Sequence, residues 1–214
     1  MKYKVTFLLD KSNLWFEKQL KKYDFKLKNK YIIKFSKNPN KIKNQNIVFP
    51  ISYTKILPES FMQKNELVII AHPSKLPNDK GFAPLQHQIL KNKKKLYISL
   101  IKAEKKVDAG PIYFQNSFKL KGTELSNEIR YIQGVQVLKI IKKFLTKYPD
   151  VKSNKQQGIG KFNKRRYPKD SQLNINKTIK QQFNHMRIND NKLYPSFFFY
   201  KGQKYILKIF KSNN

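Results

Sequence analysis

Continuous apolar runs, separated by lysine and asparagine, dominate the first half of the chain. The runs are "YKVTFLL", "KYIIKF", "NIVFPI", "ELVIIAH" and "LYISLIKA". Runs without polar alternation are typical of strands that are buried on both faces of a parallel sheet. Between the first two runs, apolar residues recur at helical spacing behind an N-cap at Ser12 or Asn13: Leu14, Trp15, Phe16, Leu20 and Tyr23. The pattern predicts an α/β fold with a Rossmann-like, mostly parallel sheet and helices on both faces.

Two further helices are expected in the middle of the chain. One is "PLQHQILKN", and the longest runs from Thr123 to about Lys147. Glu124 and Glu128 lie near the start of the longer helix and lysines near its end, as the helix dipole favours. The segment between them that reads "EKKVDAGPIYFQ" is predicted to be a loop.

The last third of the chain predicts a linker and a small module. Residues 151–170 are polar, contain glycine and proline, and lack periodicity, so they are expected to form a linker or long loop. Residues 171–214 predict an α+β module: a helix from about Thr178 to Met186, then a β-hairpin turning at Lys201–Gly202. The remaining residues, 1–150, form the main domain of this prediction.

The composition limits the class of protein. A chain of 214 residues with 39% hydrophobic residues can bury a core. No apolar run is long enough to span a bilayer, so we expect a soluble, cytoplasmic protein without a membrane partner. The absence of cysteine excludes disulfides, thiolate nucleophiles and cysteine-ligated zinc. His72, His87 and His185 lie in different segments without a carboxylate cluster, so no bound metal is expected.

The net charge of +33 favours a nucleic-acid partner. Basic side chains that neutralise phosphates supply most of the non-specific affinity for nucleic acids. Only four of the 46 basic residues are arginine, however, and the lysines are spread along the whole chain. Arginine binds phosphates and base edges better than lysine, because its guanidinium group can donate two parallel hydrogen bonds. We therefore attribute the lysines mainly to the drift of an AT-rich genome and keep nucleic-acid binding as the weaker alternative.

The glycines exclude two nucleotide-binding motifs. All seven lie at or after Gly81, so the turn after the first strand lacks the dinucleotide fingerprint, and no P-loop motif occurs. Chemistry on such a sheet is then expected at the carboxyl ends of the strands. His72 ends one strand and Asp108 follows the next long one, and in a parallel sheet these ends meet at one edge. A carboxylate at this position would orient a histidine base. A packed core histidine and a turn aspartate remain the alternatives.

Three ordered motifs resemble the signature of the N10-formyltetrahydrofolate-dependent formyltransferases: "HPSKLPNDKGFAPLQHQIL", "YISLI" and "VDAGPIY". This family includes methionyl-tRNA formyltransferase and the sugar N-formyltransferases. The resemblance begins with "SYTKILP" at Ser52 and continues through Tyr113. It extends more weakly into the tail, where "RRYPKDSQLNINKTI" and "FNHMR" resemble the sugar enzymes. It implies the formyltransferase fold, with residues 1–150 as its catalytic domain.

The resemblance also implies a role for each matching residue. His72 matches the catalytic histidine and Asp108 the catalytic aspartate. The folate-binding positions it implies are Ser52, Tyr53, Leu57, Pro58, Lys102 and Val107. The substrate-binding positions it implies are Ser74, Lys80, Gly81, Asn184 and Arg187. Lys80 stands where the family usually has arginine, and Arg187 would bind a substrate phosphate.

One position departs from the family pattern Asn-x-His-x-Ser. Ile70 stands where the asparagine would stabilise the oxyanion, so another donor is needed, such as protonated His72, a backbone N–H of the following loop, or water. The implied function is transfer of a formyl group from N10-formyltetrahydrofolate, without metal, to the primary amine of a nucleotide-linked amino sugar.

Two alternatives to this function remain open. The first is formylation of methionyl-tRNA, which the charge favours and the short tail disfavours. The second is a non-catalytic homologue that binds folate or a sugar nucleotide, which Ile70 suggests. The hydrophobic stretches of the tail also favour a homodimer.

Overall fold

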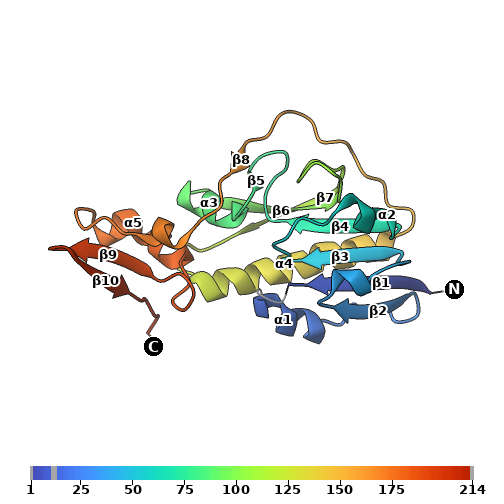
Figure 1. The fold of residues 1–214 in the computed structure, drawn as a ribbon, viewed down its shortest axis with the longest axis horizontal. Helices are drawn as coiled ribbons and strands as arrows, with labels where there is room; N and C mark the ends of the chain where they lie inside the picture. Colours follow the sequence, from blue (N-terminus) through green and yellow to red (C-terminus); the bar gives the residue numbers. More distant parts are fainter. Residues whose placement is uncertain (1, 11–13, 213–214) are drawn as a thin grey trace.

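A six-stranded sheet forms the centre of the molecule (Figure 1). The computed structural model describes residues 2–10 and 14–212. The strands lie in the order β2-β1-β3-β4-β6-β7; the first four pair in parallel, whereas β6 and β7 are antiparallel to their neighbours. The predicted α/β fold with a mostly parallel sheet is confirmed. The bounds are β1 (Tyr3–Leu9), β2 (Tyr31–Ser36), β3 (Ile47–Ile51), β4 (Leu67–His72), β6 (Lys95–Lys102) and β7 (Ile112–Lys119).

Helices cover both faces of the sheet, as predicted. On one face, α4, α1 and the 3-10 helix η1 share one large apolar cluster with the strands. On the other face, Phe61 of α2 packs with Leu8 and Val68 in a second cluster. The expected N-cap, Ser12 or Asn13, lies outside the described residues. The helix bounds are η1 (Leu14–Phe16), α1 (Glu17–Lys22), η2 (Pro39–Lys41), α2 (Glu59–Gln63), α3 (Pro84–Leu90), α4 (Ser126–Lys147), η3 (Pro168–Ser171) and α5 (Ile179–Ile188).

Strand β1 shows why unbroken apolar runs mark the central strands. Successive side chains of a strand point to opposite faces of its sheet. Val5, Phe7 and Leu9 join the cluster under α4, whereas Leu8 joins the cluster under α2. Because helices cover both faces, all four side chains are buried. A polar residue at any of these positions would therefore lower the free energy of unfolding.

Helix α4 begins three residues later than predicted, at Ser126 rather than Thr123. The Glu128 side chain accepts the Leu125 N–H at 2.8 Å and so caps the first turn. The Glu124 carboxylate instead accepts the N–H groups of Lys121 and Gly122, at 2.6 and 2.9 Å. Glu124 therefore stabilises the turn before the helix rather than the helix itself.

Strand β7 and helix α2 are among the elements that were not predicted from the sequence. The predicted loop "EKKVDAGPIYFQ" is wrong from Ile112 onward, because Ile112–Lys119 forms the edge strand β7. Most side chains of β7 are partly buried or exposed. Polar residues interrupt its sequence, so β7 lacks the continuous apolar run by which the other strands were predicted. The five-residue helix α2 is too short to show a helical period.

The segment predicted as a linker lies against the main sheet. Asn154 and Ile112 exchange two backbone hydrogen bonds, of 2.8 and 2.9 Å. Further on, β8 (Phe162–Asn163) pairs with β5 (Lys80–Gly81). In Figure 1 this segment arches from the end of α4 over the region of β5, β6 and β7. We call residues 154–163 the strap; the division of the chain into three domains stays a prediction.

The C-terminal hairpin has the predicted turn. Strands β9 (Ser196–Tyr200) and β10 (Gln203–Leu207) form a separate antiparallel sheet. Lys201 and Gly202 connect them with φ angles of +46° and +79°, as the tight turn of a two-residue hairpin requires. The hairpin lies at the opposite end of the molecule from the N-terminus (Figure 1).

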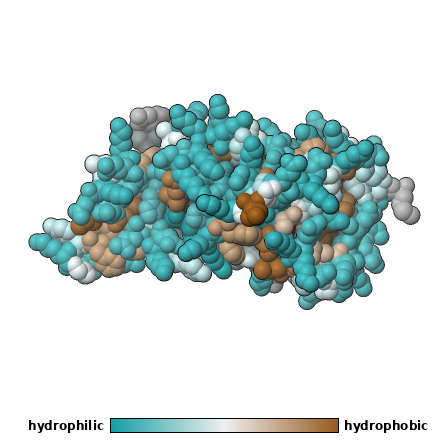
Figure 2. All heavy atoms as spheres, turned by 90° about the horizontal axis from the view of Figure 1, so that it is seen from above, coloured by the Kyte–Doolittle hydropathy of each residue, from teal (hydrophilic) through white to brown (hydrophobic). Residues whose placement is uncertain are grey.

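The surface carries the charge that the composition indicated. Figure 2 shows a largely hydrophilic surface with scattered apolar patches. Within residues 2–10 and 14–212, no helix is long and apolar enough to cross a membrane. The same residues contain no group of three or more His, Cys, Asp or Glu side chains that could hold a metal ion.

Phe144 of α4 provides a test of the core. Its ring is fully buried and packs edge-on against Phe49 and Tyr113. Phe144→Ala should lower the free energy of unfolding by about 3–5 kcal/mol, because the cavity cannot fully collapse. Urea denaturation measures the loss. The control Tyr131→Ala, on the same helix and 63% exposed, should change stability by less than about 0.5 kcal/mol; equal losses at the two positions would contradict this packing.

Candidate functional site

His72, the last residue of β4, lies between two acceptor oxygens. Its Nδ1 is 3.3 Å from Asp108 Oδ1, and its Nε2 is 3.0 Å from the Asp79 carbonyl oxygen. The side chain is only 6% exposed. A neutral imidazole donates through one nitrogen, whereas the doubly protonated ring donates through both. Both ring nitrogens thus face acceptor oxygens, and one of these belongs to the Asp108 carboxylate.

Asp108 joins the two loops that surround His72. Its Oδ1 faces His72, and its Oδ2 accepts the Gly81 N–H at 2.9 Å. Burial alone would raise the pKa of this carboxyl. The hydrogen bond and charge of His72, helped by the Gly81 N–H and the charge of Lys80, outweigh burial, so the pKa lies below its ordinary value. Asp108 is therefore a carboxylate at neutral pH.

The route by which Asp108 reaches His72 differs from the prediction. Parallel strand ends do not converge here, because β6 is antiparallel to β4 and ends with Lys102 opposite Ile69. The connection from β6 to β7 turns back toward His72 instead. Asp108 adopts a left-handed φ of +54° in this connection. A Cβ on Gly110 would lie 1.8 Å from the Lys102 carbonyl oxygen, so only glycine allows the turn to close.

The strap holds both loops from outside. Gln156 Nε2 donates to the carbonyl oxygens of Asp108 and Gly110, both at 2.8 Å. A Cβ on Gly160 would lie 1.5 Å from the Pro77 carbonyl oxygen, so glycine lets the strap contact the loop after His72. Sequence reasoning missed Gln156, because one glutamine in a polar stretch carries no signal.

A polar network, in which Ser74 and Ser99 are buried, fixes the loop that follows His72. Ser74 Oγ donates to the Asn78 carbonyl oxygen at 2.8 Å. Ser99 Oγ donates to the Ser74 carbonyl oxygen at 2.6 Å. Gln115 Nε2 donates to the Leu76 carbonyl oxygen and to Ser99 Oγ, both at 2.9 Å. Ser74 was a predicted site residue; Ser99 was not, although a lone polar residue inside the apolar run "LYISLIKA" was a usable signal.

Asp79 is the second buried carboxylate beside His72. Lys91 and Lys93 contact its two oxygens at 2.8 and 2.6 Å. Burial alone would raise the pKa of Asp79, but these lysines outweigh burial and hold the pKa below its ordinary value. The lysines thereby anchor the residue whose backbone carbonyl faces His72 Nε2.

The predicted folate-binding residues lie on two neighbouring loops. Ser52, Tyr53, Leu57 and Pro58 follow β3, while Lys102 ends β6 and Val107 precedes Asp108. Tyr53 and Leu57 pack with Ala103 on the second apolar cluster, which brings the two loops together. Burial, with a smaller contribution from the charge of Asp10, raises the pKa of Tyr53. Val107 is 41% exposed, so an apolar side chain is available at this surface.

The predicted substrate-binding residues fall into two groups. Lys80 and Gly81 lie in β5 beside Asp108, and Ser74 lies in the loop before it. Asn184 and Arg187 lie on α5, where Arg187 Nε donates to Asn184 Oδ1 at 2.6 Å. The hydrogen bonds of the described residues tie this second pair to other elements, not to His72. Arg187 is buried against Glu124, and Asn184 donates to Asn92 at 2.5 Å.

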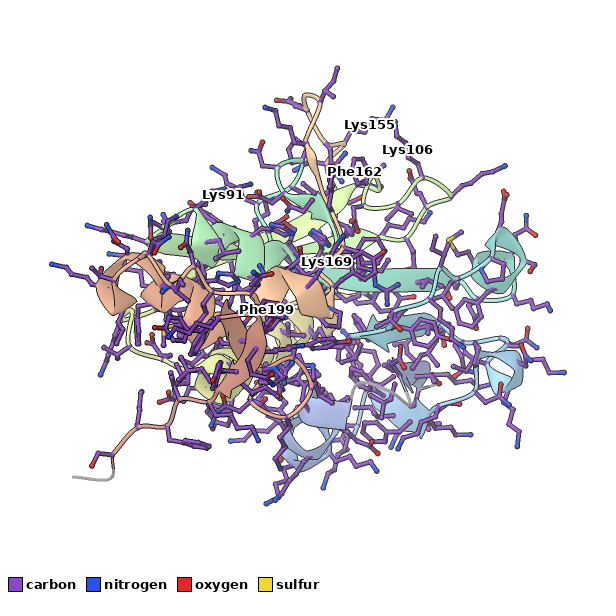
Figure 3. The ribbon with its side chains drawn as sticks, turned by 60° about the vertical axis from the view of Figure 1, so that its left-hand side comes forward. Lys91, Lys106, Lys155, Phe162, Lys169 and Phe199 are labelled. Carbon is purple, nitrogen blue, oxygen red and sulfur yellow. The ribbon has the colours of Figure 1, made fainter. Side chains whose placement is uncertain are left out.

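Lysines from several elements surround the region. Figure 3 shows Lys106 and Lys155 together at the upper edge, above Phe162 of the strap, with Lys91 and Lys169 lower in the view. Their positive charge raises the local concentration of anionic ligands.

Comparisons with known proteins identify the family and the fold. Residues 5–131 match the model of a family described as formyl transferase. The bifunctional polymyxin resistance protein ArnA from Wigglesworthia glossinidia brevipalpis is 28% identical over 87% of this chain and 30% of its own length. The chain thus spans less than a third of that curated relative.

Two solved structures share the fold over nearly their whole length. A methionyl-tRNA formyltransferase from Clostridium thermocellum superposes with a TM-score of 0.81 at 22% identity, covering 94% of this chain and 90% of that one. A sugar N-formyltransferase from a Shewanella species gives 0.71 at 16% identity, covering 97% of each chain. At these identities the similarity establishes the fold alone.

Removal of the Asp79 charge tests the anchor of the loop. Asp79→Asn should lower the free energy of unfolding at pH 7 by about 1–3 kcal/mol, because the buried site loses its charge-assisted bonds to Lys91 and Lys93. The folded-state pKa is depressed, so this stability is present above the unfolded value, about 3.9, and is lost as the pH falls through the folded value.

Urea denaturation of wild type and Asp79→Asn at several pH values measures this dependence. The difference between the two should shrink toward the acid end. Asp150→Asn, at an exposed carboxylate, serves as the control and should have little effect at any pH. A difference for Asp79→Asn that stayed constant with pH would show that its carboxylate is not the stabilising group.

Proposed function

The chain belongs to the formyl transferase family, and from this premise we propose that it transfers a formyl group from N10-formyltetrahydrofolate to the primary amine of a nucleotide-linked amino sugar. The observation that carries the chemistry is the buried His72–Asp108 pair with the Gly81 N–H on the second carboxylate oxygen. A base must be held in one orientation, and Asp108 holds Nδ1, so that Nε2, which faces the Asp79 carbonyl, is the nitrogen that would accept the proton.

The loops beside the pair fit a folate donor. Tyr53, Leu57 and Ala103 form an apolar wall, and the exposed side chains of Ile56 and Val107 add apolar surface at its edge. Flat aromatic ligands bind against walls of this kind. The bound donor supplies the formyl carbon, and the residues of this chain orient it and handle the proton.

His72 accepts the proton that the attacking amine loses. Nucleophilic attack on the formyl carbon forms a C–N bond and places negative charge on the formyl oxygen. Collapse breaks the bond to N10 of the folate, which leaves as an amine after it takes the proton that His72 holds. Asp108 stabilises the imidazolium that forms between these steps. No covalent enzyme intermediate is needed.

Given Ile70, His72 is the candidate donor for the oxyanion once it holds the amine proton and its Nε2 has left the Asp79 carbonyl. Amides in the loop after His72 already donate within the protein. The N–H of Ser74 donates to His72 O, that of Leu76 to Ser99, and that of Gly81 to Asp108. The N–H groups of Asn78, Lys80 and Phe82 donate to other backbone oxygens. The intact His72–Asp108 pair favours an active enzyme over a non-catalytic folate- or sugar-nucleotide-binding homologue.

The likeness to the Shewanella sugar N-formyltransferase, which covers 97% of both chains, supports the sugar acceptor. The second candidate acceptor is methionyl-tRNA. It is favoured by the TM-score of 0.81 to the Clostridium thermocellum enzyme and by the net charge of +33. Chain length does not separate the two, because this chain also covers 90% of that tRNA enzyme's chain.

Replacement of either member of the pair tests the catalytic assignment. His72→Ala and Asp108→Ala should each lower kcat for formyl transfer by roughly 100-fold or more, because the general base or its orientation is lost. Steady-state turnover, with circular dichroism to confirm folding, measures the effect. His87→Ala, at a histidine outside the pair, is the control. Near-wild-type turnover in a folded His72 or Asp108 variant would refute that residue's role.

A competition between acceptors tests the substrate. Purified protein with N10-formyltetrahydrofolate should formylate a nucleotide-linked amino sugar. Its affinity for tRNA should be weak, fall steeply with salt, and not depend on aminoacylation, as expected of phosphate contacts alone. Mass spectrometry of the products and filter binding at several salt concentrations give the two readouts. Formylation of initiator methionyl-tRNA in preference to every amino sugar tested would replace the proposal with the second candidate.

A further inference from the structure

The strap crosses both loops that carry the candidate catalytic pair. Its first anchor is the pair of backbone hydrogen bonds between Asn154 and Ile112 of β7. Its last anchor is the pairing of β8 with β5, which contains Gly81. Gln156 lies between these anchors, where the strap passes the loop that carries Asp108. The position of the strap is thus set at both ends independently of Gln156.

The Gln156 amide group is hydrogen-bonded to the backbone around Asp108. One Nε2 donates to two carbonyl oxygens, those of Asp108 and Gly110, each at 2.8 Å. These carbonyls belong to the peptide groups between Asp108 and Ala109 and between Gly110 and Pro111, so one side chain fixes two peptide planes of the turn. The loop needs such a restraint because Asp108 holds a left-handed φ of +54°, a conformation that disfavours residues other than glycine.

The orientation of this amide is determined by its neighbours. Nε2 faces two acceptors, and exchanging the two ends of the amide would put its oxygen against both carbonyls. Oε1 is buried and has no hydrogen-bond partner among the residues that the structure describes. Only the donor end of the side chain is used, so its contribution can be removed without losing any other bond of the described residues.

From these contacts we propose that Gln156 is a positioning residue for formyl transfer: it holds the Asp108 loop so that one carboxylate meets both His72 and the Gly81 N–H. The proposal rests on the proposed function for its catalytic consequence, but not for its structural one. Gln156 does not touch His72 in this arrangement; it acts through the backbone of Asp108.

The variant Gln156→Glu removes the donor while keeping the shape. It places carboxylate oxygens against the Asp108 and Gly110 carbonyls, so the loop is pushed from its position. The control is Gln157→Glu, which makes the same charge change at the adjacent, exposed position. Should Gln156→Glu fold poorly, Gln156→Leu removes the donor without adding charge and gives the same comparison.

Three measurements on the 214-residue chain are combined. The kcat of Gln156→Glu should fall by about 10- to 100-fold, since small misplacement of a catalytic group costs rates of this order. KM for donor and acceptor should stay within about twofold, because the binding residues are unchanged. Amide hydrogen exchange should show lost protection at Gly81, whose N–H bonds to Asp108. Gln157→Glu should match wild type in all three.

Two outcomes would overturn the proposal. One is unchanged Gly81 protection in Gln156→Glu, which would show that the strap does not hold the loop. The other is a fall in kcat that is matched by an equal rise in KM or by global loss of stability, which would show a general structural role. Absence of formyl transfer in the wild type would refute the proposed function instead, and the exchange at Gly81 would still decide whether Gln156 holds Asp108.

Discussion

The carboxylate of Asp108 is the contact on which the geometry of the candidate site depends. One oxygen meets His72 Nδ1 and the other accepts the Gly81 N–H, so a single buried charge ties the loop after β4 to the loop after β6. Removing a charge of this kind leaves an unpaired ring and an unpaired amide in a water-poor place. Several contacts of the surrounding loops and the strap keep this carboxylate in position.

The change from parallel to antiparallel pairing determines how the chain reaches that contact. Between β3 and β4 the sheet is parallel, and β4 ends at His72. Because β6 runs the other way beside β4, the β6–β7 connection must fold back to approach His72. Gly110 makes the turn sterically possible, and Gln156 of the strap bonds its backbone. The strap, whose sequence showed no helical or strand periodicity, thereby supports the turn that carries Asp108 and Gly110.

The sequence predicted those features that depend on burial or on ordered motifs. The unbroken runs identified β1, β3 and β4, because helices cover both faces of these strands. The motifs around His72 and Asp108 identified the pair, although the reasoning from parallel strand ends was wrong. Edge strand β7 escaped prediction because its polar residues interrupt the apolar pattern. Gln156 and Gln115 escaped because their partners are backbone oxygens far away in the chain, and no local pattern records such a bond.

The two hydrogen bonds of His72 also indicate which contact must change during turnover. A base that accepts a proton starts as a neutral ring, and a neutral ring donates to only one of its two acceptor neighbours. The bond to Asp108 is charge-assisted and therefore the stronger, so the contact between Nε2 and the Asp79 carbonyl is the one that yields to the substrate amine. Asp79 is in turn anchored by Lys91 and Lys93. In the proposed mechanism, the loop that carries Asp79 thus covers Nε2 of the base.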